Sequence, residues 1–300
     1  MRFAGAIDIG GTAVKIGIVG EDGTIIRRES VPTSRDGEPI ALVDAIVSSL
    51  QPMMDTSNSE RGPVSGIGVS VAGFLDPEHL GMIHNANLKA LREFPLRRAL
   101  EKRFSLDCPL EVDSNAAVIA EHRHGAGRGS TRLLGVTLGT GLGGGVIIDG
   151  QLLRFTGECA GDIGHIIVER NGRLCTCGAR GCLEAMVNVA ALSERGGGRT
   201  VRDIITSARK GDQVAVSALS ETGWWLGLGL ASLSPLFSPD TIAVGGGISA
   251  AGELLLESAR ASYHTHARPE FRDRTRVVGS SFEGWEGMIG AASLSLNPLA

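Results

Sequence analysis

One histidine and three cysteines lie close together in the middle of the chain. Within the stretch 161–184, which reads GDIGHIIVERNGRLCTCGARGCLE, they are His165, Cys175, Cys177 and Cys182. One imidazole and three thiolates form a ligand set typical of tetrahedral Zn²⁺. Clustered cysteines without a secretion signal indicate a metal site more often than a disulfide, so the spacing predicts a structural zinc ion. The alternative is three buried thiols and an unrelated histidine.

Two carboxylates flank these ligands. Asp162 precedes His165 by three residues, and Glu184 follows Cys182 by two. A bound ion would hold both carboxylates in place, so a structural metal could still shape a pocket. The other cysteines, Cys108 and Cys159, are predicted to be small buried residues, although Cys159 is near enough to His165 to line the same pocket.

Two segments repeat the order apolar strand, glycine-rich turn with a threonine, and returning strand. The first has strands at 3–9, 14–19 and 24–28 around DIGGT, and the second has strands at 133–138, 146–148 and 151–155 around GTGLGGG. Backbone N–H groups of such turns bind anions. The repeat predicts two halves that clamp one polyphosphate. The candidate residues are Asp8, Gly10, Gly11 and Thr12 in the first turn and Thr140, Gly141 and Gly143 in the second turn.

A third glycine-rich turn, with Gly245, Gly246 and Gly247, follows a strand at 241–244. Its glycines permit the close approach of a flat ligand such as a nucleoside. Asp113 lies between a short strand at 110–112 and a helix at 114–124. A carboxylate at this junction could do chemistry, but Asp is also favoured as a helix N-cap, and the spacing alone leaves both interpretations open.

The rest of the chain alternates between predicted helices and connecting segments. Apolar residues at helical spacing predict helices at 39–54, 95–106, 201–209, 212–233, 251–262 and 284–296. The polar stretch 56–63 predicts a loop, and the glycine-rich stretch 193–199 predicts a flexible linker. Trp224 and Trp225 are predicted to be core residues of the helix at 212–233.

Composition limits the classes of partner. The 300 residues are 42% hydrophobic and carry a net charge of −4, which gives no electrostatic basis for binding nucleic acid. Neither a signal sequence nor an apolar run long enough for a membrane span is evident. We therefore expect a soluble cytoplasmic protein with reduced thiols and no membrane partner.

Together these motifs resemble the ROK family of sugar kinases and sugar-responsive repressors, over nearly the whole chain. The matching segments are DIGGT at 8–12, VDSNAAVIAE at 112–121, LGTGLGGG at 138–145, His165 with CTCGARGCLE at 175–184, and VGGGIS at 244–249. The Cys-rich segment is the most specific of these matches.

The resemblance implies a two-lobed α/β fold of the actin-like ATPase type, a duplicated ribonuclease H-like fold with a cleft between the lobes. The lobes would comprise residues 1–113 plus 286–300 and residues 114–285, the second carrying the zinc site. The resemblance also implies ATP with Mg²⁺, a homodimer, and phosphorylation of a hexose or hexose-like sugar at its primary hydroxyl. Asp113 would be the general base. The sugar side would comprise Gly73, Asn87, Val112, Asp113, Asp162, His165 and Glu184.

Three positions depart from the family pattern. Val112 stands where an Asn usually contacts the sugar, Asp162 stands where the kinases usually have Glu, and Ala13 stands where Lys often follows the first turn, with Lys15 nearby. The alternative function is a non-catalytic sugar sensor without a DNA-binding domain. The family's repressors carry a helix-turn-helix before the first strand, whereas seven residues precede Asp8 here, and this favours the kinase.

Overall fold

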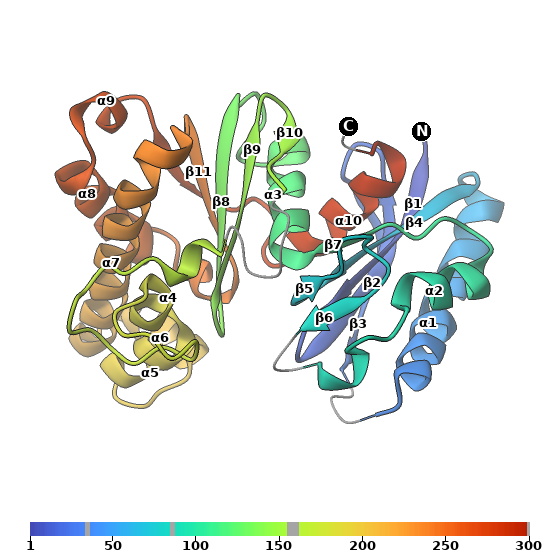
Figure 1. Ribbon diagram of the computed structural model, residues 1–300, viewed down its shortest axis with the longest axis horizontal. Helices are drawn as coiled ribbons and strands as arrows, with labels where there is room; N and C mark the ends of the chain where they lie inside the picture. Colours follow the sequence, from blue (N-terminus) through green and yellow to red (C-terminus); the bar gives the residue numbers. More distant parts are fainter. Residues whose placement is uncertain (34–36, 85–87, 155–161, 299–300) are drawn as a thin grey trace. The chain divides into compact units, whose positions relative to one another are not determined.

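The computed structural model describes residues 1–33, 37–84, 88–154 and 162–298, which form two compact units (Figure 1). The first unit contains the described residues of 1–124, together with Arg154 and 285–298; the second contains 125–153 and 162–284. The predicted boundary at 113 differs from this division, because the helix that begins at Asp113 packs against the helix at the end of the chain.

The first unit is built on a five-stranded sheet in the order β3-β2-β1-β4-β7. Its strands are β1 (Phe3–Ile9), β2 (Ala13–Gly20), β3 (Ile25–Pro32), β4 (Val64–Val71) and β7 (Leu110–Val112). The first three are antiparallel neighbours, whereas β4 and β7 run parallel to β1. A separate pair, β5 (Phe74–Leu75) and β6 (Met82–His84), is followed by the 3-10 helix η1 (Lys89–Leu91).

Alternation along β1 sends its side chains to two faces of the sheet. Ile7 and Ile9 belong to a core cluster completed by α1 (Pro39–Glu60) and α2 (Leu96–Phe104). Ala4 and Ala6 face the opposite way, toward α10 (Glu286–Leu296), which packs against α3 (Asp113–His124). Asp8 follows the same alternation onto the α10 face. The apolar pattern of this strand therefore delivers one carboxylate to the end of the sheet.

The second unit repeats this topology. Its sheet has the order β10-β9-β8-β11-β12, formed by β8 (Arg132–Leu138), β9 (Leu142–Ile148), β10 (Gln151–Leu152), β11 (Thr241–Gly245) and β12 (Arg276–Gly279). Again three antiparallel strands are followed by two parallel ones. The predicted duplication is confirmed.

In the second unit, helices connect β10 to β11 and β11 to β12, and the two longest, α7 and α8, pack against each other. The α-helices are α4 (Leu183–Val187), α5 (Val189–Arg195), α6 (Val201–Ala208), α7 (Gln213–Phe237), α8 (Glu253–His266) and α9 (Pro269–Arg272). The 3-10 helices are η2 (Ile163–His165) and η3 (Gly247–Ala251). In the described part of the chain, no helix combines the length and the apolar character needed to cross a membrane.

Three local predictions were wrong. Residues 56–60 continue α1 instead of forming a loop, because Ser57 is buried and Asn58 accepts a hydrogen bond from the N–H of Val64. Residues 193–195 belong to α5 instead of a linker. Trp224 is 39% exposed and lies edge-on to both Trp225 and His266, so it is not a core residue.

Candidate functional site

The first turn brings a buried carboxylate next to a lysine. Asp8 is 8% exposed, and its Oδ1 accepts a hydrogen bond from Ser70 Oγ at 2.6 Å. Lys15 Nζ lies 3.5 Å from Asp8 Oδ2. The two residues pair directly in the β1–β2 ladder, and one further pair separates them from the turn. The turn itself is closed by the Gly10 N–H, which donates to the carbonyl of Ala13. Lys15, two residues after Ala13, thus places a positive charge beside this turn.

Asp113 begins α3 and is half-buried. Its Oδ1 accepts a hydrogen bond of 2.8 Å from the N–H of Ser114, the next residue in the chain. A carboxylate that caps a helix instead accepts a hydrogen bond from the N–H two or three positions further along. Burial, and then the negative charge of Asp8, raise the pKa of Asp113 to about 7. A carboxylate with such a pKa is suited to exchange a proton near neutral pH.

Glu111, one strand residue earlier than Val112, was missed by the sequence analysis. It is 1% exposed, and its Oε1 accepts hydrogen bonds from the Val112 N–H and from Asn115 Nδ2, both at 3.0 Å. Arg154 Nη2 lies 3.1 Å from Glu111 Oε2, which supplies the opposite charge that a buried carboxylate requires. Glu111 therefore fixes both sides of the junction that holds Asp113. The only signal in the sequence was a charged residue inside an apolar strand.

The predicted sugar-side residues of the first unit are only partly described. Val112 is half-buried at the end of β7. Gly73, between β4 and β5, has φ 123°. Asn87 lies outside the described residues.

The four predicted metal ligands come together in the second unit. The ligand atoms of His165, Cys175, Cys177 and Cys182 all lie within 4.8 Å of one another. Cys175 Sγ is 3.5 Å from His165 Nδ1, and Cys177 Sγ is 3.6 Å from Cys182 Sγ. Two thiolates on one Zn²⁺ lie about 3.8 Å apart when each Zn–S bond is about 2.3 Å. The cluster therefore has the donor set and the dimensions of a zinc site.

The second ring nitrogen of His165 faces a carboxylate. His165 Nε2 is 3.3 Å from Asp162 Oδ2, while Nδ1 faces the thiols. Histidine ligands of metals commonly donate their other N–H to a carboxylate, which fixes the ring and its tautomer. Asp162, predicted on the sugar side, is placed by the structure as the partner of His165.

Glu184 connects the metal cluster to the second turn. Its Oε2 accepts a hydrogen bond from the Leu142 N–H at 3.0 Å, and its Oε1 lies 3.4 Å from Thr176 Oγ1 and 3.6 Å from Cys175 Sγ. A Cβ on Gly141 would lie 2.5 Å from Glu184 Oε2, so the absence of a side chain at 141 admits the carboxylate. No sequence motif indicated this contact, because 42 positions separate the bonded residues.

The third turn packs beside the second. Gly245 pairs with Thr137 along the β8–β11 ladder, and Gly246 has φ 85°. A Cβ on Gly246 would collide with the backbone of Leu138, so glycine is required there by both conformation and space. Thr140 and Gly141 thus share one end of the sheet with Gly245–Gly247.

Comparisons with known proteins give matches over nearly the whole chain. A family model described as the ROK family matches residues 4–297. A glucokinase from Streptomyces coelicolor is 34% identical over 316 residues, covering 97% of each protein, and an N-acetylmannosamine kinase from Escherichia coli is 29% identical over 300 residues, again covering 97% of each. The crystal structure of a ROK family glucokinase from Streptomyces griseus in complex with glucose and AMPPNP is 34% identical, with a TM-score of 0.85 and coverage of 97% of this chain and 98% of that chain.

Proposed function

Because this chain belongs to the ROK family and is an ATP-dependent sugar kinase, we propose that it phosphorylates a hexose or hexose analogue at the primary hydroxyl, with Asp113 as general base. The duplicated α/β sheet is the actin-like ATPase fold that the resemblance implied. The kinase prediction is likewise confirmed at the level of the enzyme class by the glucokinase relatives.

The observation that supports Asp113 as base is its half-buried carboxylate with a pKa of about 7 at the start of α3. In the proposed reaction, the sugar oxygen forms a bond to the γ-phosphorus of ATP while the bond from that phosphorus to the β,γ-bridging oxygen breaks. The hydroxyl proton passes to Asp113, and ADP leaves. Phosphoryl transfer depends mainly on positioning and charge neutralisation, so the protein has little covalent chemistry to supply beyond one base.

The other residues have binding roles in this proposal. The first and second turns bind the phosphates through backbone N–H groups, and the third turn approaches the nucleoside. Mg²⁺ bound with ATP would neutralise phosphate charge, and we assign Asp8 as its nearby carboxylate. Zn²⁺ would be held by His165 and the three cysteines and would supply rigidity, not chemistry. Asn87, Val112, Asp162 and Glu184 remain the proposed sugar contacts, together with Gly73 and His165.

A sugar panel tests the proposal. Sugar-dependent ADP release is measured with glucose, mannose, N-acetylglucosamine, N-acetylmannosamine and a 6-deoxyhexose. The proposal predicts release with at least one hexose or N-acetylhexosamine and none with the 6-deoxy sugar, which lacks the primary hydroxyl. Binding of a sugar without ADP release would instead favour the non-catalytic sensor. The homodimer expected from the resemblance is tested separately, by light scattering.

A further inference from the structure

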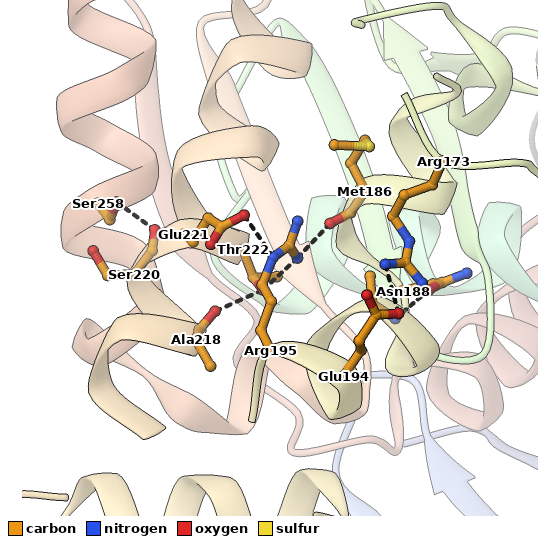
Figure 2. Close-up of polar contacts among 11 residues, drawn as sticks. Arg173, Met186, Asn188, Glu194, Arg195, Ala218, Ser220, Glu221, Thr222 and Ser258 are labelled. Carbon is orange, nitrogen blue, oxygen red and sulfur yellow. Dashed lines mark hydrogen bonds and ion pairs between the residues drawn. The ribbon is translucent and has the colours of Figure 1, made fainter. Parts of the chain in front are cut away.

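Two adjacent residues at the end of α5 bond to both ends of the metal-binding segment (Figure 2). Glu194 Oε2 lies 2.8 Å from Arg173 Nη1, and Arg195 Nη1 donates to the carbonyl of Met186 at 2.7 Å. Arg173 precedes the first cysteine ligand by two residues, and Met186 follows the last by four. The segment from 173 to 186, which contains three metal ligands and Glu184, is therefore held at each end by α5.

Arg195 also fastens this segment to the longest helix of the unit. Its Nε donates to Glu221 Oε1 at 2.8 Å, and its Nη1 donates to Thr222 Oγ1 at 3.1 Å, both on α7. The Arg195 side chain is only 12% exposed, and Thr222 is fully buried. Figure 2 shows the guanidinium between the α7 residues and the Met186 carbonyl.

The contact of Arg195 with Met186 lies at the C-terminal end of the short helix α4, where the carbonyl groups lack hydrogen-bond donors. α4 has five residues, so its last carbonyls have no partners within the helix. A buried guanidinium at this end satisfies a carbonyl and complements the partial negative charge of the helix C-terminus. Because Glu184 lies on the first turn of α4, fixing the end of this helix also fixes the carboxylate.

The beginning of α5 is joined to the second turn. The Val189 N–H donates to the carbonyl of Gly139 at 3.0 Å, and the Asn188 side chain caps α5 by accepting from the Ala191 N–H. α5 thus touches the second turn at one end and the metal-binding segment at the other. Both regions also meet at Glu184, which bonds Leu142 and lies beside Cys175.

We propose that Arg195, assisted by Glu194, is a positioning residue that holds the metal-binding segment and Glu184 in place for the reaction. The inference rests on the proposed function, because it assigns Glu184 to the sugar side. Among the described residues, the hydrogen bonds of Arg195 go to neither the predicted metal ligands nor the second turn. It acts through α4, so its loss should loosen both metal retention and sugar binding while leaving ATP binding largely intact.

The test compares Arg195→Met with Arg199→Met. Arg199 is a matched control: its Nε donates to the carbonyl of Gly196, and its other nitrogens pair with Asp212 at the start of α7, so it bonds a carbonyl and a carboxylate outside α4. Zinc release to a chromophoric chelator is measured, together with KM for the best sugar and for ATP. We expect Arg195→Met to release zinc about tenfold faster and to raise the sugar KM about tenfold, with the ATP KM within about twofold of wild type. Arg199→Met should match wild type in all three.

Two further variants keep the proposal testable if Arg195→Met fails to fold. Arg195→Lys keeps the positive charge at Met186 but loses the fork of donors, and Glu194→Gln removes only the ion pair with the partly exposed Arg173. Each should release zinc faster than wild type. Zinc release at the wild-type rate in the Arg195 variants, or equal acceleration in Arg199→Met, would overturn the proposal. If the wild type phosphorylates no sugar, the proposed function fails, and the zinc measurement alone still decides whether Arg195 holds the segment.

Discussion

The carboxylate of Glu184 accepts a hydrogen bond from the Leu142 N–H at 3.0 Å while its other oxygen lies 3.6 Å from Cys175 Sγ. One side chain therefore touches both the second turn and the predicted zinc site. A metal in this position would influence catalysis without contacting any reacting atom, because it fixes the residue that joins the two.

The close approach of Gly141 to Glu184 gives a direct test of this connection. A methyl group at 141 would lie 2.5 Å from Glu184 Oε2 and must displace the carboxylate, whereas a methyl group at Gly139 meets nothing within 4 Å. We predict that Gly141→Ala loses about 1 kcal/mol of stability, the contribution of one hydrogen bond, and that Gly139→Ala does not. Denaturant unfolding measures the difference. Equal stability of the two variants would show that the Glu184 contact contributes nothing.

Removal of the metal should affect the second unit specifically. Cys182 is fully buried and supplies one of four ligand atoms, so Cys182→Ser should retain less than about one-tenth of the zinc bound by wild type. Chelation of the wild type should lower Tm, since metal binding to the folded state alone stabilises it. Elemental analysis of protein purified without chelators should find one zinc per chain. A finding of none would refute the site.

The pKa of Asp113 predicts a stability effect with a definite sign. Burial and the charge of Asp8 raise this pKa to about 7, from about 3.9 in an unfolded chain. Folding therefore favours protonated Asp113. The stabilisation of the folded state by this proton is fully present below about pH 4 and is lost as the pH rises through about 7. Asp113→Asn carries no charge, so its Tm should exceed that of wild type at pH 8, and this excess should shrink toward pH 4. Thermal melts over that range measure it, and an excess independent of pH would contradict the assignment.

The departures at Val112 and Asp162 predict altered sugar preference. Val112 offers no side-chain hydrogen bond to a sugar hydroxyl, whereas Asn offers both a donor and an acceptor. Asp162 has a shorter reach than Glu, and it pairs with His165. Val112→Asn and Asp162→Glu should therefore raise kcat/KM for glucose, relative to the best N-acetylhexosamine, by roughly tenfold for Val112→Asn. If wild type already prefers glucose and neither variant changes the ratio, these residues do not set specificity.

Much of the fold could be predicted from local patterns. The apolar run at 3–9 indicated a strand, and the repeated turns indicated the duplication. The metal cluster could also be predicted, because its three cysteines are close in sequence. These features depend on neighbours along the chain.

The remaining features depend on residues distant in sequence. The bond from Leu142 to Glu184 and the contacts of Glu111 with Arg154 exist only after the strands and helices have packed. The stretch 193–195 was mistaken for part of a linker because three glycines follow it, whereas the bonds of Arg195 to Met186 and Thr222 were not visible in the sequence. Polar sequences in particular need tertiary partners to be interpreted.

The most direct test of the account is sugar-dependent ADP formation by wild type and Asp113→Asn, measured from pH 5 to 9 with the best sugar from the panel. Wild-type kcat should rise with pH through a midpoint of about 7, as the Asp113 carboxylate loses its proton. Asp113→Asn should lose about 10²- to 10⁴-fold in kcat at pH 8 while remaining folded. A folded Asp113→Asn variant that turns over at the wild-type rate would contradict it.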